Sequence, residues 1–314
     1  MAQTLTLLQL VLPVFLIIGA GCAMRKAGIL TSKADESLLG VLVKLFIPCL
    51  ALDVIIGNEA LARPSHLIWP PLAGFLSVAI GVGVCYVAGR IFIRNPVKRG
   101  TFAAVTGLQN YAYIPLPLCH ALFEKEVTGV LFAFNLGVEV AMWSLVVATI
   151  AGRDPARRWW RPLISPPILA VIVGIVLNLF GAGAWIPSAI DTSWHLLGQC
   201  AVPLGLLLTG AMLADYFTPH VMSKDAGITL LAIVLRLGVL PPALIGLAFL
   251  LPADPSLKAV LMVQAAMPTA VFPIALTRLH NGDVPTALRS VLATSVLGLL
   301  TIPLWLTFSL RLLP

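Results

Sequence analysis

Ten long apolar runs, separated by short polar or Pro- and Gly-rich segments, dominate this chain of 314 residues. A helix needs about 20 apolar residues to cross a hydrocarbon core ~30 Å thick. A transmembrane β-barrel would instead show shorter segments of alternating hydrophobicity. The sequence therefore predicts an all-α polytopic membrane protein with ten transmembrane helices, at residues 4–24, 36–57, 67–92, 100–121, 127–150, 163–183, 190–213, 224–251, 257–278 and 284–311.

The composition agrees with this class and excludes others. Hydrophobic residues make up 59% of the chain and charged residues 11%, whereas soluble domains have about 25% charged residues. A soluble fold of this size could not hide so much apolar surface from water. The five cysteines lie within apolar runs and form no CxxC pair, so neither a disulfide nor a zinc site is predicted. The net charge of +7 forms no basic stripe, so nucleic acid is not an expected partner.

Lys and Arg residues are unevenly distributed between the loops. The odd-numbered loops contain 13 of them and the even-numbered loops contain 3. Because basic loops remain on the cytoplasmic side, we expect the odd-numbered loops to be cytoplasmic. Ten crossings then place both termini outside, in the extracellular or periplasmic space. The first run lacks the basic start of a signal peptide, so it is predicted to be a retained transmembrane helix.

Prolines recur at matched spacings in the two halves of the chain. The spacings are 35 and 67 residues for Pro13, Pro48 and Pro115, and 36 and 65 residues for Pro167, Pro203 and Pro268. This pattern predicts two five-helix repeats, residues 1–151 and 163–314, joined by a cytoplasmic linker at 152–162. Because five is odd, the second repeat enters the membrane from the opposite side. Inverted repeats of this kind are typical of secondary transporters.

The fourth and ninth runs carry prolines in their middle, in NYAYIPLPL and AAMPTAVFPIAL. A proline inside a helix removes a backbone hydrogen bond, and lipid tolerates such a break only where it lines a cavity or is buried in protein. Half-helix N-termini at the breaks would present free N–H groups and a positive dipole end, which suit an anion. We therefore expect a substrate site where the runs break, at Pro115 and Pro268.

Several segments carry a family resemblance. They are LPVFLIIGAGCAMRKAGIL near the start, LFIPCLAL in the second run, NYAYIPLPLCHALF in the fourth, QAAMPTAVFPIALTRLHNGD in the ninth and VLATSVLGLLTIPLWL in the tenth. On these residues the chain resembles the auxin efflux carrier family, which includes plant auxin exporters and bacterial malonate-type carriers. The resemblance extends over essentially the whole chain.

The resemblance implies a fold similar to that of bile acid:sodium symporters. In that fold, interrupted helices 4 and 9 cross at their prolines near the membrane midplane. Helices 1, 2, 6 and 7 form a scaffold, and helices 3–5 and 8–10 form an elevator-type transport domain, with homodimers through the scaffold. The family's crossover asparagine corresponds to Asn110, and the ninth-helix side corresponds to Ala265–Thr269. The tyrosines of NYAYIP depart from the small residues expected there, and the short central loop gives no reason to expect plant-type regulation.

The candidate substrate-binding residues surround this crossover. Asn110 can donate two hydrogen bonds to a carboxylate without adding a permanent charge, so the anion could still leave. The other candidates are Gln109, Tyr111, Tyr113, Pro115, Gln264, Pro268 and Thr269.

Ionisable residues within the runs are further candidates, because they are costly in a membrane and often mark pathways or buried partners. Glu139 lies in the middle of the fifth run, with Asn135 one helical turn before it on the same face. Glu139 is predicted to couple transport to protons, to form a polar wall of the site, or to form a structural pair with Lys44 or Arg236. Lys44 and Arg236 could instead snorkel or cap a neighbouring helix.

The sequence as a whole predicts a secondary transporter that moves a small organic anion across the inner membrane by alternating access. A dicarboxylate or an auxin-like aromatic acid is the expected kind of substrate. A sodium-coupled symporter of the same architecture is the alternative, because Gln109, Asn110, Gln264 and Thr269 could supply oxygen ligands. A channel or a sensor is a third reading, which the repeat disfavours. The sequence contains no HExxH, GxSxG or GxxxxGK motif, so we predict no enzymatic activity, cofactor or metal site.

Overall fold

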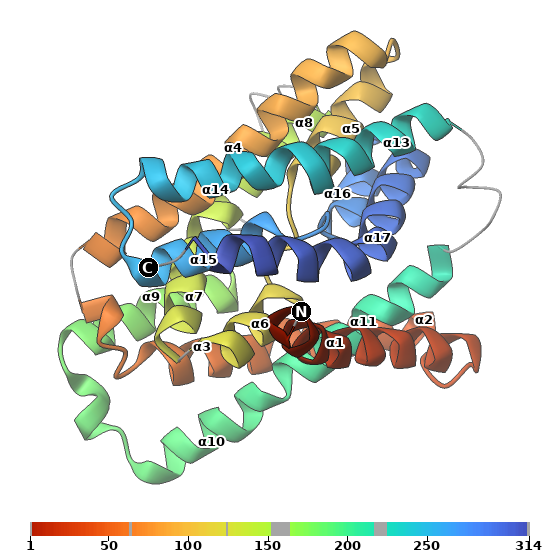
Figure 1. Cartoon of the computed structure of the whole chain (residues 1–314). Coiled ribbons are helices and arrows are strands. Elements are labelled where there is room, and N and C mark those ends of the chain that lie inside the picture. Colours follow the sequence, from red (N-terminus) through yellow and green to blue (C-terminus); the bar gives the residue numbers. More distant parts are fainter. Residues whose placement is uncertain (1, 63–64, 124, 152–163, 217–224, 313–314) are drawn as a thin grey trace.

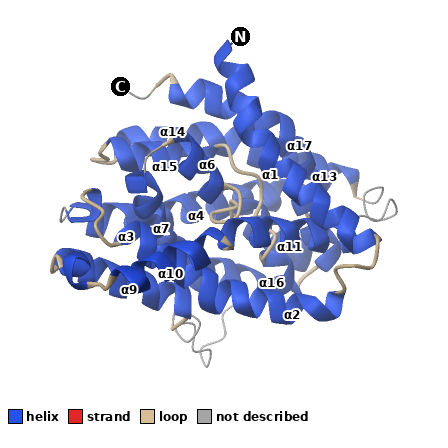
Figure 2. Cartoon of the chain, turned by 90° about the horizontal axis from the view of Figure 1, so that it is seen from below, coloured by secondary structure: helices blue, strands red, loops and turns tan. Residues whose placement is uncertain are grey.

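The computed structural model describes residues 2–62, 65–123, 125–151, 164–216 and 225–312. These residues form helices joined by loops, and no strand occurs among them (Figure 2). Six helical segments are long and apolar enough to cross a membrane: Ser32–Ile55, Leu67–Phe92, Lys125–Ala151, Ser188–Asp215, Ala226–Leu250 and Val284–Leu310. The prediction of an all-helical, polytopic membrane protein is therefore confirmed, whereas the number of ten crossings stays a prediction.

Helical residues occur in each of the ten predicted crossings. In the first half the helices are α1 (Ala2–Lys26), α2 (Ser32–Val41), α3 (Ile47–Ile55), α4 (Ser65–Phe92), α5 (Pro96–Gly107), α6 (Pro115–Leu122), α7 (Lys125–Ala141) and α8 (Val147–Ala151). In the second half they are α9 (Pro166–Leu179), α10 (Ser188–Gln199), α11 (Ala201–Tyr216), α13 (Ala226–Val234), α14 (Leu240–Leu250), α15 (Pro255–Ala265), α16 (Pro273–Leu279) and α17 (Val284–Leu310). The predicted linker at 152–162 lies outside the described residues.

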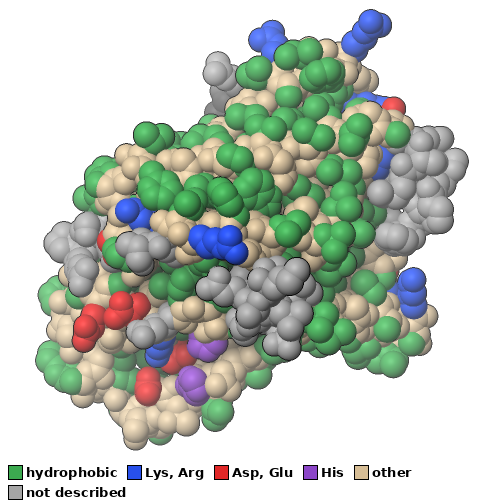
Figure 3. Space-filling view, in the orientation of Figure 1, with side chains coloured by type: hydrophobic (Ala, Val, Ile, Leu, Met, Phe, Trp, Pro, Cys, Tyr) green, Lys and Arg blue, Asp and Glu red, His purple; other side chains and the backbone are tan. Residues whose placement is uncertain are grey.

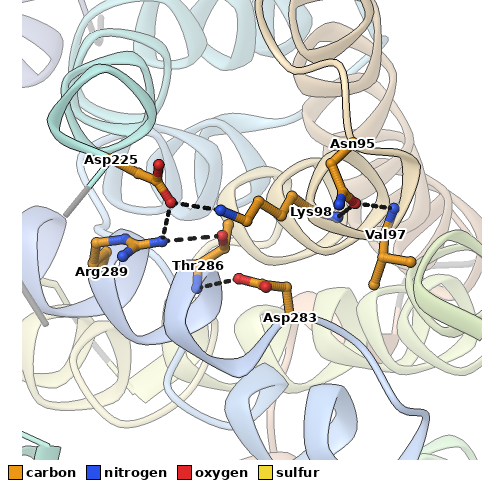
Figure 4. Close-up of polar contacts among 7 residues, drawn as sticks. All are labelled: Asn95, Val97, Lys98, Asp225, Asp283, Thr286 and Arg289. Atoms are coloured by element: carbon orange, nitrogen blue, oxygen red, sulfur yellow. Dashed lines mark hydrogen bonds and ion pairs between the residues drawn. The ribbon is translucent and has the colours of Figure 1, made fainter.

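The polar segments between the apolar runs start helices by a common device. Asn95, Asp254 and Asp283 each precede a helix and accept a backbone hydrogen bond from its first turn, at 2.9–3.1 Å. A proline follows each cap within two residues, where its missing N–H costs nothing. Figure 4 shows the caps at Asn95 and Asp283. The NP, DP and DVP strings thus fix where α5, α15 and α17 begin.

Short segments of π-helix interrupt two of the long helices just before a proline. Leu42–Phe46 precedes Pro48, and Leu235–Val239 precedes Pro241. A proline cannot donate to the preceding turn and its ring clashes there, so the turn widens. Two predicted crossings therefore remain continuous but are locally unwound.

Glycines allow the closest helix pairs to approach. Gly137 of α7 lies against the carbonyl oxygen of Pro71 in α4, and Gly210 of α11 lies against that of Ile18 in α1. A Cβ at either glycine would overlap with that oxygen. Small residues at such contacts are typical of helix pairs in membranes, where packing replaces the hydrophobic effect as the driving force.

The helices form two groups that adjoin each other. One group contains α1, α3, α9, α10 and α11, and the other contains α4, α5, α7, α13, α14, α15 and α17. In Figure 1, α1, α3, α10 and α11 occupy the lower half, and α4, α13, α14 and α17 occupy the upper half. The groups meet where α1 packs against α17 and α3 packs against α7. The candidate site lies along this boundary.

Candidate functional site

Two helices are interrupted in the interior by breaks of equal length. The helix α5 ends at Gly107 and the chain resumes helical structure at Pro115, and α15 ends at Ala265 before α16 begins at Pro273. Residues 108–114 and 266–272 form the breaks, seven residues each. Both restarting helices begin with a proline, a residue that is well tolerated at the first helical position.

The two breaks pair with each other in antiparallel orientation. The N–H of Asn110 donates to the carbonyl oxygen of Pro268 at 2.7 Å, and the N–H of Ala270 donates to that of Leu108 at 3.0 Å. Gln109 and Thr269 are partners in a β-bridge between these two bonds. The backbone groups that the helices leave unpaired therefore satisfy each other, as buried irregular backbone requires.

The position of the breaks differs from the prediction in one respect. Pro115 does not interrupt a helix but starts α6, eight residues after α5 ends. Pro268 lies inside the second break, and its carbonyl oxygen accepts the bond from Asn110. Pro273, which starts α16, is the structural counterpart of Pro115. The matched spacing of Pro115 and Pro268 was therefore a misleading guide to the break itself.

A cavity of about 230 Å³ opens on one side of the paired breaks. It lies between α3 and α9 of one group and α7 of the other, and Asn110, Tyr111, Tyr113, Asn135 and Glu139 line it. Glu139 is the only residue with a formal charge among the residues described as lining this cavity. We call this space the acidic cavity.

Glu139 is held by two uncharged donors. The Tyr111 hydroxyl donates to Oε1 at 2.8 Å, and Trp143 Nε1 donates to Oε2 at 3.0 Å. Both carboxylate oxygens are therefore satisfied by hydrogen bonds from inside the cavity. The predicted structural pair of Glu139 with Lys44 or Arg236 is wrong, because the Lys44 side chain is exposed and Arg236 bonds elsewhere.

A second cavity of about 330 Å³ opens on the other side of the breaks. It lies between α1 and α11 of one group and α17 of the other, and Cys22, Lys26, Thr209 and Ser295 are its polar or ionisable lining residues besides Asn110. Lys26 is the only charged residue among those that line it in the described chain. We call this space the basic cavity.

Asn110 and Val271 line both cavities. Asn110 is 4% exposed, and its backbone N–H bonds the carbonyl oxygen of Pro268. Because Val271 is apolar, Asn110 provides the polar side chain between the two cavities. Within the described residues, the N–H groups of Ala112 and Tyr113, which precede α6 and line the acidic cavity, have no hydrogen-bond partner. An oxyanion bound next to Asn110 could accept hydrogen bonds from the side-chain amide and from these backbone N–H groups.

The remaining predicted residues are buried in the crossover rather than placed on a cavity wall. Gln109, Gln264 and Thr269 are fully buried; Gln109 Nε2 donates to Ser77 Oγ at 2.7 Å, and Gln264 Nε2 donates to the Tyr111 carbonyl at 3.2 Å. The side-chain oxygens of Gln109, Gln264 and Thr269 have no hydrogen-bond partner in the described part of the chain. Pro115 and Pro268 are buried as well.

Arg236 is a buried cation directly behind the crossover. Its side chain is 0% exposed, and its Nε donates to the carbonyl oxygen of Met267 at 3.0 Å. That carbonyl follows the end of α15, where the helix dipole is negative. The guanidinium therefore caps a neighbouring helix, which is one of the roles that the sequence analysis proposed for Arg236. Its position next to the second break could not be inferred from the sequence.

Sequence reasoning did not assign Trp143, Lys26, Ser77 or Thr294 to the site. Trp143 is a donor to Glu139, and Thr294 Oγ1 accepts from the Thr269 N–H at 3.3 Å. The four-residue spacing of Glu139 and Trp143 places both on one helix face and was a usable signal. Ser77 and Thr294 belong to other crossings, and nothing in their local sequence marks them.

The buried crossover, the two cavities beside it and the membrane-spanning helices define a polytopic membrane protein with interior cavities. The model of the family described as membrane transport protein matches residues 6–158 and 156–306, and the chain belongs to this family. The predicted relationship to auxin efflux carriers is confirmed, and this is a family of transporters rather than of enzymes.

Three relatives illustrate this relationship. The chain is 23% identical to an uncharacterized transporter of Methanothermobacter thermautotrophicus over 300 residues, 95% of this chain and 96% of that protein. It is 24% identical to an uncharacterized transporter of Methanocaldococcus jannaschii over 305 residues, 95% of this chain and 97% of that protein. It is also 24% identical to auxin efflux carrier component 8 of Arabidopsis thaliana over 127 residues, 40% of this chain and 34% of that protein.

Proposed function

We propose that this transporter carries a small organic anion, a dicarboxylate or an aromatic acid, by alternating access through the crossover. The observation that supports this most is the place of Asn110. It is the polar side chain common to the two cavities, and it lies where the breaks pair. A solute bound at Asn110 would be in contact with both the acidic cavity and the basic cavity, without entering the hydrocarbon core of the membrane.

The charges around the crossover favour an anion. The unpaired N–H groups before α6 and the Asn110 amide can bond a carboxylate, and Arg236 places a buried positive charge behind the second break. Lys26, whose side chain is exposed, adds a positive charge to the basic cavity. The anion therefore approaches Asn110 through the basic cavity, and the carboxylate of Glu139 faces it from the acidic cavity.

The architecture that we propose has ten crossings in two inverted repeats. The equal breaks, their antiparallel pairing and the helix groups of the fold support it. The group with α1, α3, α9, α10 and α11 would be the scaffold, through which two copies form a homodimer, and the other group would be the moving transport domain. The basic odd-numbered loops support an inner-membrane protein with both termini outside.

A sodium-coupled symporter is a second candidate, favoured by a specific observation. The unpaired oxygens of Gln109, Gln264 and Thr269 belong to three residues of the crossover, two of which are bridge partners. Side-chain and backbone oxygens are the ligands that hard cations prefer. In this reading the cation would sit within the crossover, beside the anion rather than in place of it.

The test is uptake into proteoliposomes from a panel of dicarboxylates and aromatic acids, with an imposed proton or sodium gradient. For a transported acid, Asn110→Ala should weaken binding by about 1–3 kcal/mol, or ~5- to 150-fold, while the protein remains folded. The control is Asn178→Ala, because the Asn178 amide bonds the backbone of Asn58 and Gly57 far from the cavities and should affect stability alone.

Two outcomes would contradict the proposal. Unchanged affinity with a lowered melting temperature in Asn110→Ala would make Asn110 a structural amide. Conductance without saturation or counterflow would show a channel rather than a carrier. Uptake that responds to a sodium gradient and not to a proton gradient would favour the symporter.

A further inference from the structure

A third cavity, of about 570 Å³, opens between the end of α4 and the start of α13, away from the crossover. Its walls include Phe92 and Ile93 on one side and Ile228 and Leu231 on the other. The floor is α5, because its Phe102 and Ala103 form a buried cluster with Ile93, and Ile228 and Leu231 pack against that cluster. Farther along the chain, α14 packs against α4. Figure 1 shows the end of α4 and the start of α13 apart at the upper right.

The walls of this groove continue into a strongly apolar surface. Ile91 and Phe92 are 71% and 68% exposed at the end of α4, and Leu230 and Val234 are 61% and 48% exposed on α13. In a membrane-spanning helix bundle these side chains face lipid chains. A hydrocarbon chain in the groove would therefore extend the contacts of the surrounding membrane.

The polar end of the groove is basic. Lys98 Nζ lies 2.7 Å from Asp225 Oδ2, and Arg289 Nη2 lies 3.1 Å from the same oxygen (Figure 4). Among these three residues, Lys98 and Asp225 line the groove, so with Arg94 its lining carries two cations and one carboxylate. Arg94, also in the lining, is exposed and forms no hydrogen bond or ion pair with another described residue. Figure 3 shows Lys and Arg side chains next to hydrophobic surface at this upper end of the molecule.

We propose that this groove binds an anionic phospholipid, with an acyl chain along Phe92 and Leu231 and the phosphate at Arg94 and Lys98. Basic pockets between membrane helices on the cytoplasmic side are suited to anionic headgroups. The charge distribution places this end of the bundle on that side. Because α5 carries Lys98 and leads to Asn110, a bound lipid would brace the helix that ends at the crossover.

Gly227 gives a direct way to close the groove. It lines the cavity, and a Cβ there would meet no atom within 4 Å. Gly227→Leu should therefore fill the groove without disturbing the protein. The matched control is Gly246→Leu on α14, which also has open space around it and lies outside the lining. Arg94→Gln tests the headgroup contact independently, with Arg90→Gln as its control on the same helix end.

The experiment measures binding to the purified full chain by native mass spectrometry and by thermal stabilisation. The probes are phosphatidylglycerol, phosphatidylcholine with the same acyl chains, and inorganic phosphate. We expect phosphatidylglycerol to stabilise the protein and the other two to have little effect. Gly227→Leu should lower phosphatidylglycerol affinity at least about tenfold, and Arg94→Gln about fivefold, the effect of one basic residue near an anionic lipid surface.

Each alternative outcome would overturn the proposal. Equal stabilisation by phosphatidylcholine would show ordinary lipid contact without headgroup recognition. Stabilisation by phosphate alone would show an ion site. Unchanged phosphatidylglycerol binding in Arg94→Gln and in folded Gly227→Leu would place the lipid elsewhere. If Gly227→Leu does not fold, Arg94→Gln against Arg90→Gln decides the question.

Discussion

Glu139→Gln is expected to separate the charge of Glu139 from its hydrogen bonds. In the structure both carboxylate oxygens accept, one from the Tyr111 hydroxyl and one from Trp143 Nε1. A glutamine can accept from the indole N–H, which only donates, and can donate to the tyrosine oxygen, which also accepts. The variant should therefore fold with its local contacts in place.

The magnitudes follow from this geometry. Glu139→Ala would leave two donors unsatisfied at ~1–3 kcal/mol each, so its stability should fall by roughly 2–6 kcal/mol. Glu139→Gln should lose far less. For an anion bound about 7 Å from the carboxylate, at an effective dielectric constant of ~20, it removes a repulsion of ~2 kcal/mol. Anion affinity at neutral pH should therefore rise by up to about 30-fold.

The assay is acid binding and proton-gradient-driven uptake in proteoliposomes, with Glu126→Gln at the start of α7 as a control outside the acidic cavity. If Glu139 carries the coupled proton, Glu139→Gln binds substrate but no longer responds to the gradient. Full gradient-driven uptake with unchanged affinity in the well-folded variant would refute the reasoning.

Three other predictions test packing, charge and topology. Gly137→Ala should destabilise the α4–α7 pair by about 3 kcal/mol or more, measured by denaturation, whereas Gly83→Ala on the open face of α4 should be nearly neutral. The hydrogen bond from Lys98 holds the pKa of Asp225 below its ordinary value. Asp225→Asn should therefore lower the melting temperature at neutral pH, and the difference should vanish as pH falls through that lowered pKa. A cysteine at Gly152 should be labelled only from the cytoplasmic side, and one at the C-terminus only from outside.

Helix positions could be predicted from the sequence because local chemistry sets them. The Asn95-Pro96 and Asp254-Pro255 pairs cap and start helices wherever they occur in such a chain. The breaks were placed less accurately, because proline marks either the inside of a break or the first turn after it. Pro268 does the former and Pro115 the latter. Only the pairing between distant segments distinguishes the two.

The candidate site was predictable only as far as local sequence indicates it. Asn110, Tyr111 and Glu139 line one cavity. The first two were singled out beside a predicted break, and Glu139 as a carboxylate in the middle of an apolar run. The residues that complete the site come from other crossings. Arg236 lies in the π-helical segment between α13 and α14, and Lys26 lies at the end of α1. Their roles depend on which helices adjoin, which a single sequence does not specify.

In the proposed cycle, the structure corresponds to a state in which both cavities lead to the side predicted to be cytoplasmic. The acidic cavity reaches Ser165 at the start of α9, and the basic cavity reaches Lys26 at the end of α1. Both ends adjoin odd-numbered loops, so both cavities lead to Asn110 from the side predicted to be cytoplasmic. On the other side, Lys125 of α7 lies 3.1 Å from Asp53 of α3, and this pair joins the two helix groups. If the proposed alternating access moves one group against the other, we expect the Asp53–Lys125 pair to separate when the side predicted to be outside opens.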